Sequence, residues 1–320
     1  MILVVAEQRE GTLNRASWET LAAAQRLAGG TPVKAVVFGQ AIGGVGQELA
    51  TGVAEVLTVE HADLARYTPD AFTQALQQVI AAARPTDVLL PHTYQTRDFV
   101  PMAAVRLGAP LITDVTGVNG SGASATFTRP MFQGKLSAEV RHEGPGPRLV
   151  TIQIGAFRAD AVSREVAGTV TRVDVTIDTA AIRQMPEPPF KEAKQAVDLG
   201  QAERIVAVGR GIKSQENIAI AERLARAMSA EVAASRPICD SGWLPMERQI
   251  GSSGQTVAPK LYVALGISGA IQHLVGMKGS RTIVAINKDA DAPIFEVADY
   301  GIVGDLFEIV PALAAELEKQ

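Results

Sequence analysis

The segment Gly266–His273, with the sequence GISGAIQH, places two glycines, a serine, a glutamine and a histidine directly after the apolar run 261–265. A tight turn from a buried strand into a helix leaves backbone N–H groups without partners, and glycine lets a ligand approach them. Such a turn favours an anion, and His273 adds a group that phosphate binding alone does not need. The alternative for His273 is a buried histidine that its protein neighbours satisfy.

Four other apolar runs in the second half of the chain also end in small polar clusters. RIVAV at 204–208 is followed by GRGIKS, AEVAA at 230–234 by SRPICDSG, TIVAI at 282–286 by NKD, and YGIV at 300–303 by GDLF. The carboxyl ends of parallel strands lie at one edge of a sheet, so we expect the clusters to converge on one crevice. Each cluster is a weak signal alone, and GRGIKS is not a complete GxGxxG. Together they predict a ligand that contains a nucleotide, because phosphate favours helix N-termini and ribose favours Asn or Asp.

Arg236 is the first candidate side chain outside these glycine turns. It follows the run 230–234 and precedes Pro237, which predicts an extended pair. A guanidinium at a strand end can stack on a planar ring or compensate an anion. A surface ion pair is the alternative interpretation.

The segment 247–261, ERQIGSSGQTVAPKL, is too long and too rich in hydroxyls for a simple connection. Ser252 and Ser253 lie between Gly251 and Gly254 and can bond to the edge of a heterocycle or to a phosphate. A solvated serine loop is the alternative.

The elements that must position these residues follow a strand–helix alternation. In the first part, apolar runs at 2–6, 33–38, 54–59 and 87–91 alternate with helical spacing, as in 68–84, where Thr68 is the expected N-cap and Pro69 the first helical residue. This alternation predicts a parallel sheet covered on both faces.

Residues 111–173 change to period-two alternation, which predicts an antiparallel addition with hairpins closed at Gly134 and at the GPGP run 144–147. Residues 178–203 contain Pro186, Pro188 and Pro189 and predict a linker centred near Pro188. We therefore expect an α/β protein with two domains. The first, 1–190, is a parallel-sheet domain with antiparallel hairpin additions, and the second, 198–320, is smaller, doubly wound and parallel.

Composition limits the function classes. The 320 residues are 47% hydrophobic and 20% charged with a net charge of −4, which fits a soluble protein and argues against a nucleic-acid surface. Cys239 is the only cysteine, so there is no internal disulfide and no metal site built on cysteines. The four histidines are scattered, and we expect no metal. The N-terminal apolar run is too short for a signal peptide and no run approaches ~20 residues, so we expect a cytoplasmic protein that does not span a membrane.

Residues 203–312 resemble, almost without gaps, the FAD-binding domain of the electron transfer flavoprotein alpha subunit family. The resemblance is carried by GRGIKSQENIAIAERLA, SRPICDSGWLP and the continuous segment from QIGSSGQTVAPKLYVALGISGAIQH to DYGIVGDLFEIVP. TYQTRDFVPMAAVRLGAPLITDV and TRPMFQGKLSAEV are similar, more loosely, to the first domain of the same family. The resemblance therefore covers the whole chain.

This resemblance implies an electron carrier, without substrate turnover of its own, that binds FAD in its C-terminal domain. It implies pairing with a beta subunit through the first domain, electron donors such as acyl-CoA and other dehydrogenases, and a membrane quinone oxidoreductase as acceptor. The residues that match the family's flavin contacts are Arg210, Ser235, Arg236, Ile250, Gly251, Ser252, Ser253, Ser268, Gly269, Ala270, Ile271, Gln272, His273, Asn287, Asp305 and Leu306.

By the same resemblance, Ser268 and the amides around Gly269 serve the pyrophosphate, and Asn287 and Asp305 serve the adenosine end. Arg236, Ser253 and His273 lie at the isoalloxazine ring. Reduction places negative charge on the N1/C2=O edge of that ring, so a cation and a donor there favour the reduced form and raise the potential.

The chain departs from the family pattern in two places. The family's usual Gly-Gln-Thr-Gly is Gly251-Ser252-Ser253-Gly254 here, which keeps a hydroxyl at 253 but loses the longer amide at 252. The segment TIQIGAF at 151–157 lacks an expected Arg-Pro before its glycine. The first change affects the tuning of the flavin, and the second the contact between subunits.

Two other function classes fit a doubly wound domain. An NAD(P)-dependent dehydrogenase requires a full GxGxxG with an acidic residue ~20 positions on, and GRGIKS lacks the third glycine. A non-catalytic nucleotide-binding regulator needs only the phosphate turns, and it would leave Arg236, Ser253 and His273 without a ring to act on. Flavin binding discriminates between these alternatives.

Overall fold

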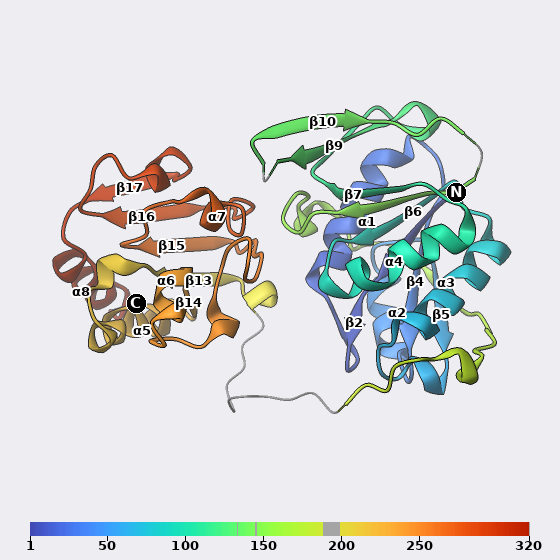
Figure 1. Ribbon diagram of the computed structural model, residues 1–320, viewed down its shortest axis with the longest axis horizontal. Helices are drawn as coiled ribbons and strands as arrows, with labels where there is room; N and C mark the ends of the chain where they lie inside the picture. The colour runs from blue at the N-terminus through green and yellow to red at the C-terminus, as the bar shows by residue number, and fades with distance from the viewer. Residues whose placement is uncertain (133, 145, 188–198, 320) are drawn as a thin grey trace. The chain divides into compact units, whose positions relative to one another are not determined.

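The computed structural model describes residues 1–132, 134–144, 146–187 and 199–319. The chain divides into two compact units, Met1–Phe190 and Lys191–Gln320, each built on its own parallel sheet (Figure 1). The α/β class and the two parallel sheets predicted from the sequence are confirmed.

The sheet of the first unit has seven strands in the order β12-β5-β4-β1-β6-β11-β7, and all of them pair in parallel. Its apolar runs are buried on both faces, which is why the strands lack polar alternation. The strands are β1 (Ile2–Ala6), β4 (Val33–Gly39), β5 (Glu55–Glu60), β6 (Asp87–Pro91), β7 (Leu111–Val115), β11 (Arg148–Ile152) and β12 (Thr169–Arg172).

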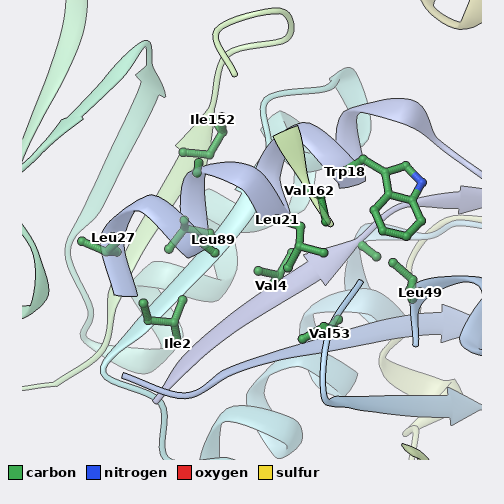
Figure 2. Close-up of a cluster of buried hydrophobic side chains, with 14 of the residues drawn as sticks. Ile2, Val4, Trp18, Leu21, Leu27, Leu49, Val53, Leu89, Ile152 and Val162 are labelled. Carbon is green, nitrogen blue, oxygen red and sulfur yellow. The ribbon is translucent and has the colours of Figure 1, made fainter. Parts of the chain in front are cut away.

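Helices cover both faces of this sheet. Thr68 caps the N-terminus of α3 by accepting from the Ala71 amide, with Pro69 at the first position, as predicted. Figure 2 shows one of the two cores, in which Trp18 and Leu21 of α1 pack near Val4 of β1. The helices are α1 (Arg15–Ala28), α2 (Gly43–Leu49), α3 (Pro69–Ala83) and α4 (Tyr94–Leu107), with short 3-10 turns η1 (Ala62–Leu64), η2 (Gly122–Ser124), η3 (Ala159–Ala161) and η4 (Thr179–Ala181).

The antiparallel addition is smaller than predicted. It consists of the three-stranded sheet β8 (Gly117–Asn119), β9 (Thr126–Met131) and β10 (Leu136–Val140), with the predicted hairpin at Gly134. A separate hairpin of β2 (Gln8–Arg9) and β3 (Thr12–Leu13) lies outside the predicted range. The hairpin predicted at 144–147 is wrong. That run, in which Pro145 lies outside the described residues, leads from β10 to β11, and β11 enters the parallel sheet between β6 and β7.

The first unit also holds part of the predicted linker. Gln74 and Gln78 of α3 accept from the amides of Asp178 and Thr176, and Arg183 donates to the buried Asp70. These contacts fix the chain up to Arg183 against the first unit. Residues 188–198, which include the expected centre of the linker, lie outside the described residues.

The second unit is a five-stranded parallel sheet in the order β14-β13-β15-β16-β17, which confirms the doubly wound prediction. Helices α5 and α8 cover one face, whereas the loop 249–257 and α7 cover the other. The strands are β13 (Arg204–Val208), β14 (Glu231–Ala234), β15 (Leu261–Leu265), β16 (Ile283–Asn287) and β17 (Tyr300–Val303). The helices are α5 (Ile218–Ala227), α6 (Arg236–Asp240), α7 (Ile271–Leu274) and α8 (Leu306–Leu317), with η5 (Leu199–Gln201), η6 (Arg210–Ile212), η7 (Gln215–Asn217), η8 (Met246–Arg248) and η9 (Pro293–Glu296).

This strand order fixes where a ligand belongs. The chain passes from β13 to β14 on one side and then returns to place β15 on the other, so the direction of winding reverses between β13 and β15. Crevices at the carboxyl ends of strands beside such a reversal are the usual ligand sites of doubly wound sheets. Across the described ranges, no helix has the length and apolar character that crossing a bilayer requires.

Candidate functional site

A cavity of about 730 Å³ lies at the carboxyl ends of β13, β14, β15 and β16 in the second unit, a size typical of ligand pockets. Four of the five predicted clusters, together with the loop 249–253, form its wall. The lining residues are Gly209, Arg210, Gly211, Lys213, Ser235, Arg236, Pro237, Gln249, Ile250, Gly251, Ser252, Ser253, Gly266, Ile267, Ser268, Ala270, Gln272, His273, Asn287, Lys288 and Asp289.

The glycines that follow β13 and β15 contact each other, and this contact leaves no room for a side chain. The Gly211 amide donates to the Gly266 carbonyl at 3.0 Å, and a Cβ on Gly211 would lie 2.6 Å from Gly266 Cα. A Cβ on Gly209 would lie 2.5 Å from the Gly266 carbonyl oxygen. Their immediate role is therefore to let two turns touch at the floor of the cavity, whereas the sequence suggested only the approach of a ligand.

The serine loop is tied to helix α7. Gly251 adopts φ +142° close to the Gln272 carbonyl, and the Ser252 amide donates to that same carbonyl at 2.7 Å. The side-chain Nε2 of Gln249 donates to Ser253 Oγ at 3.0 Å. The buried Oε1 of the same side chain has no hydrogen-bond partner in the described part of the chain. The loop thus brings Gln249 and Ser253 to the cavity wall.

His273 is buried, with 6% of its surface exposed. Its Nε2 lies 2.9 Å from the Tyr262 hydroxyl, and its Nδ1 has no hydrogen bond of standard geometry to any described residue. Burial lowers the pKa of His273 to about 4, and the nearby Ile250 backbone opposes part of this shift. The imidazole is therefore neutral near pH 7, and its Nδ1 is buried beside the Ile250 backbone.

Cationic side chains surround the cavity: Arg210, Lys213, Arg236 and Lys288. Arg236 was expected in an extended pair with Pro237, and this is wrong because Arg236 begins helix α6 after Ser235. Its side chain is 67% exposed and bonds to Asp240 at 3.2 Å. Lys213 lies over the ring of Phe307 at 4.5 Å. Among the described residues, the only carboxylate in the wall is that of Asp289.

Sequence reasoning missed Lys213, Gln249 and Lys288 as individual site residues. The signal was present for both lysines, because GRGIKS and NKD follow strands directly. Gln249 gave no such signal. Its place depends on β14, whose Ala234 pairs with it in an isolated bridge.

Most of the predicted contact residues line the cavity, and four do not. Gly269 packs against the Ile294 backbone with φ +87°, and Ile271 is half exposed at the start of α7. Asp305 caps α8 by accepting from the Phe307 amide at 2.9 Å, and Leu306 is buried in the core beside it. The contacts predicted with a cofactor stay predictions, both for these four residues and for those that line the cavity.

Asn287 lines the cavity, but its amide already binds protein groups. Its Nδ2 donates to the Ile267 carbonyl at 2.9 Å, and its Oδ1 accepts from the Asp289 amide at 3.1 Å. Asn287 thus joins the end of β16 to the turn after β15. Any bond to a ribose would use the remaining Nδ2 hydrogen or oxygen lone pair.

The arrangement suits a dinucleotide. Cations compensate phosphate charge, while Gln249 Oε1 and His273 Nδ1 are buried polar atoms of the cavity wall without partners among the described residues. The fold and site define an α/β protein that binds a nucleotide cofactor.

Comparison with known proteins identifies the family and the cofactor. Residues 2–178 match the electron transfer flavoprotein domain, and residues 198–278 match the electron transfer flavoprotein FAD-binding domain. The chain belongs to the electron transfer flavoprotein alpha subunit family, and its cofactor is FAD. It is 39% identical to electron transfer flavoprotein subunit alpha of Bacillus subtilis, over 99% of this chain and 97% of the relative.

Two other relatives match this chain over nearly their full length. Electron transfer flavoprotein subunit alpha of Thermoanaerobacterium thermosaccharolyticum is 38% identical, over 99% of this chain and 98% of the relative. The acryloyl-CoA reductase electron transfer subunit beta of Anaerotignum propionicum is 38% identical, over 98% and 94%. Membership of this family, together with the incomplete GRGIKS motif, disfavours the NAD(P)-dependent dehydrogenase and the regulator as alternatives.

Proposed function

We propose that this chain is the alpha subunit of a heterodimeric electron carrier that accepts electrons from dehydrogenases of the acyl-CoA type. The pair passes them to a membrane quinone oxidoreductase, and the chain turns over no substrate itself. The observation that carries the proposal is the cavity at the reversal of the second sheet, which combines four cationic side chains with one carboxylate among its described residues. This composition favours holding a redox cofactor over acid–base chemistry.

FAD, when bound, supplies a ring that takes up and releases electrons. The residues of the chain set its environment. Arg210, Lys213 and Lys288 provide positive charge for a pyrophosphate, and Ser253 provides a hydroxyl. Arg236 is exposed in this chain, and an exposed cation acts weakly because water screens it. We infer that Arg236 acts strongly only when the cofactor or partner covers it.

The first unit is proposed to contact the beta subunit. The hairpin of β9 and β10 exposes large apolar side chains at its end, with Phe132 70% and Leu136 60% exposed. Apolar side chains gathered at a projecting hairpin are a common feature of protein interfaces. The names of the relatives in Bacillus and Thermoanaerobacterium describe subunits, which supports an assembly.

The test is to produce the chain with the beta subunit encoded beside it and to record absorption during stepwise reduction. We expect bound FAD, reduction by an acyl-CoA dehydrogenase with its substrate, and reoxidation by a quinone oxidoreductase in membranes. The matched control replaces Phe132 and Leu136 by serine. This variant should lose the beta subunit while the cavity residues stay intact. A pair without flavin would overturn the proposal.

A second candidate follows from the Anaerotignum relative, whose name assigns it to an acryloyl-CoA reductase. In that case the chain would deliver electrons to a bound reductase instead of a membrane acceptor. Copurification separates the two: a stable complex with an acyl-CoA reductase supports the second candidate, and a free heterodimer that reduces quinone through membranes supports the first.

A further inference from the structure

The hydroxyl of Tyr262 is buried against His273 beneath the cavity. Tyr262 lies in β15 with no exposed surface and packs in the core that contains Ile250 and Met277. Its hydroxyl lies 2.9 Å from His273 Nε2, and the structure gives this hydroxyl no other partner among the described residues. The two rings are tilted at 57° with centroids 6.2 Å apart.

The protons of this pair can be placed by counting donors and acceptors. Burial raises the pKa of Tyr262 well above its ordinary value, so the hydroxyl keeps its proton. Burial lowers the pKa of His273 to about 4, so the imidazole is neutral near pH 7 and carries one ring proton. That proton is on either Nε2 or Nδ1.

The two placements differ in what they leave unsatisfied. With the proton on Nε2, Tyr262 would accept, its own proton would have no acceptor, and Nδ1 would be a buried lone pair beside the Ile250 backbone. With the proton on Nδ1, Tyr262 donates to Nε2 and only one group, the Nδ1–H, lacks a good partner among the described residues. Buried polar groups without partners are costly, so the second placement is favoured.

We propose that Tyr262 is a positioning residue that holds His273, a residue of the cavity wall, in the Nδ1–H tautomer. His273 Nδ1 has almost no exposed surface, so its proton stays within the protein, beside the Ile250 backbone. Tyr262 touches no cofactor itself and acts through His273, whose tautomer is set by the bond at its other nitrogen.

The position of Tyr262 explains why the pair forms. Side chains alternate along β15, so Tyr262 and Ala264 share the face covered by α7 and the loop 249–257, while Val263 and Leu265 face α5 and α8. Helix α7 starts after the turn at the end of β15 and carries His273 back over that face. The sheet thus places a hydroxyl under the histidine that lines the cavity.

The experiment is nitrogen NMR of isotope-labelled histidine in the full chain, first alone and then with the beta subunit and FAD. The four histidines are distinguished by single substitutions. We expect His273 to be a single Nδ1–H tautomer in the unsubstituted chain. Tyr262→Phe removes one oxygen and should produce a mixture of tautomers.

The matched control is Tyr67→Phe, which removes a partly buried hydroxyl bonded to Asp98 in the other unit. It should not change the His273 tautomer. Nε2–H in the unsubstituted chain overturns the proposal even if FAD binds, and so does a pure Nδ1–H form that persists in Tyr262→Phe. Failure of the pair to bind FAD overturns the proposed function but leaves the tautomer measurement readable in the chain alone.

Discussion

Gly211 and Gly266 meet backbone to backbone at the floor of the cavity, with the Gly211 amide 3.0 Å from the Gly266 carbonyl oxygen. They follow β13 and β15, the strands that flank the reversal of the sheet. A side chain on either residue would separate the two turns. The close approach of these strand ends therefore requires glycine at both positions.

We expect Gly211→Ala to destabilise the second unit. The added Cβ would lie 2.6 Å from Gly266 Cα, and neither backbone can move away without shifting a strand end. Overpacking of this kind costs about 1–3 kcal/mol. Urea unfolding followed by Trp243 fluorescence measures the effect. Gly44→Ala, where the added Cβ meets nothing within 4 Å, is the control and should cost nothing. Equal stability of the two variants would contradict the packing argument.

Arg236→Ala should lower the midpoint potential of FAD in the heterodimer. Removing a cation that interacts more strongly with the reduced ring weakens the binding of that form, and a tenfold difference corresponds to about 59 mV for a one-electron couple. The side chain of Arg236 is 67% exposed in this chain, and water screens an exposed charge. We therefore expect the midpoint potential to fall by less than about 59 mV, unless the partner subunit covers Arg236. Potentiometric titration of the heterodimer measures the shift.

Arg223→Ala is the control for Arg236→Ala. Arg223 is an exposed arginine of the same unit that bonds to Glu318 and does not line the cavity. It changes the net charge equally and should leave the potential unchanged. Equal shifts in both variants would assign the effect to overall charge and reject a specific role for Arg236.

Acid should destabilise the second unit through His273. The pKa of His273 is about 4 in the folded chain, whereas the ordinary histidine value of 6.5 applies to the unfolded chain. Between these values the unfolded chain binds a proton that the folded chain does not. Stability therefore falls as the pH drops from 6.5 to 4, by about 3 kcal/mol in total. His273→Gln should flatten this dependence in urea unfolding followed by Trp243. An unchanged slope would show that His273 is not the titrating group.

The strands were predictable from sequence wherever burial on both faces produced a continuous apolar run, as in β1, β6, β13 and β15. The failure at 144–147 has the opposite cause. Glycine and proline mark a turn without showing which strands it joins, and β11 pairs in parallel with β6 and β7, whose residues lie up to about sixty positions before it. Pairing between distant strands has no local signature.

The candidate site likewise contains residues that the sequence could place and contacts that it could not. Ser268 and Lys288 lie within three residues of the ends of β15 and β16, so their convergence follows from a parallel sheet. The bond between Tyr262 and His273 depends on how α7 folds back over β15, and the role of Gly266 depends on Gly211. Such contacts cannot be predicted from the sequence, because each depends on the positions of two residues in the folded chain.

The stability of the first unit should depend on pH in the opposite direction, because the pKa of Glu19 is raised whereas that of His273 is lowered. Its carboxylate is 2% exposed, accepts from the Gly155 amide at 2.7 Å and lies 3.8 Å from Arg15. Burial raises the pKa of Glu19 to about 7, although Gly155 and Arg15 oppose the shift. Gly155 belongs to the segment 151–157, so the state of Glu19 bears on how this loop is held.

Glu19→Gln should stabilise the first unit at alkaline pH and have little effect at acidic pH. The ordinary pKa of 4.5 applies to the unfolded chain, which therefore loses this proton between pH 4.5 and 7 while the folded chain retains it, so stability falls as the pH rises. The full penalty is about 3 kcal/mol above pH 7, and glutamine avoids it while still accepting from Gly155. Urea unfolding followed by the neighbouring Trp18 measures it, with the exposed Glu48→Gln in α2 as control. A gain for Glu19→Gln that is the same at pH 4 and pH 8 would mean that the carboxylate does not titrate in this window.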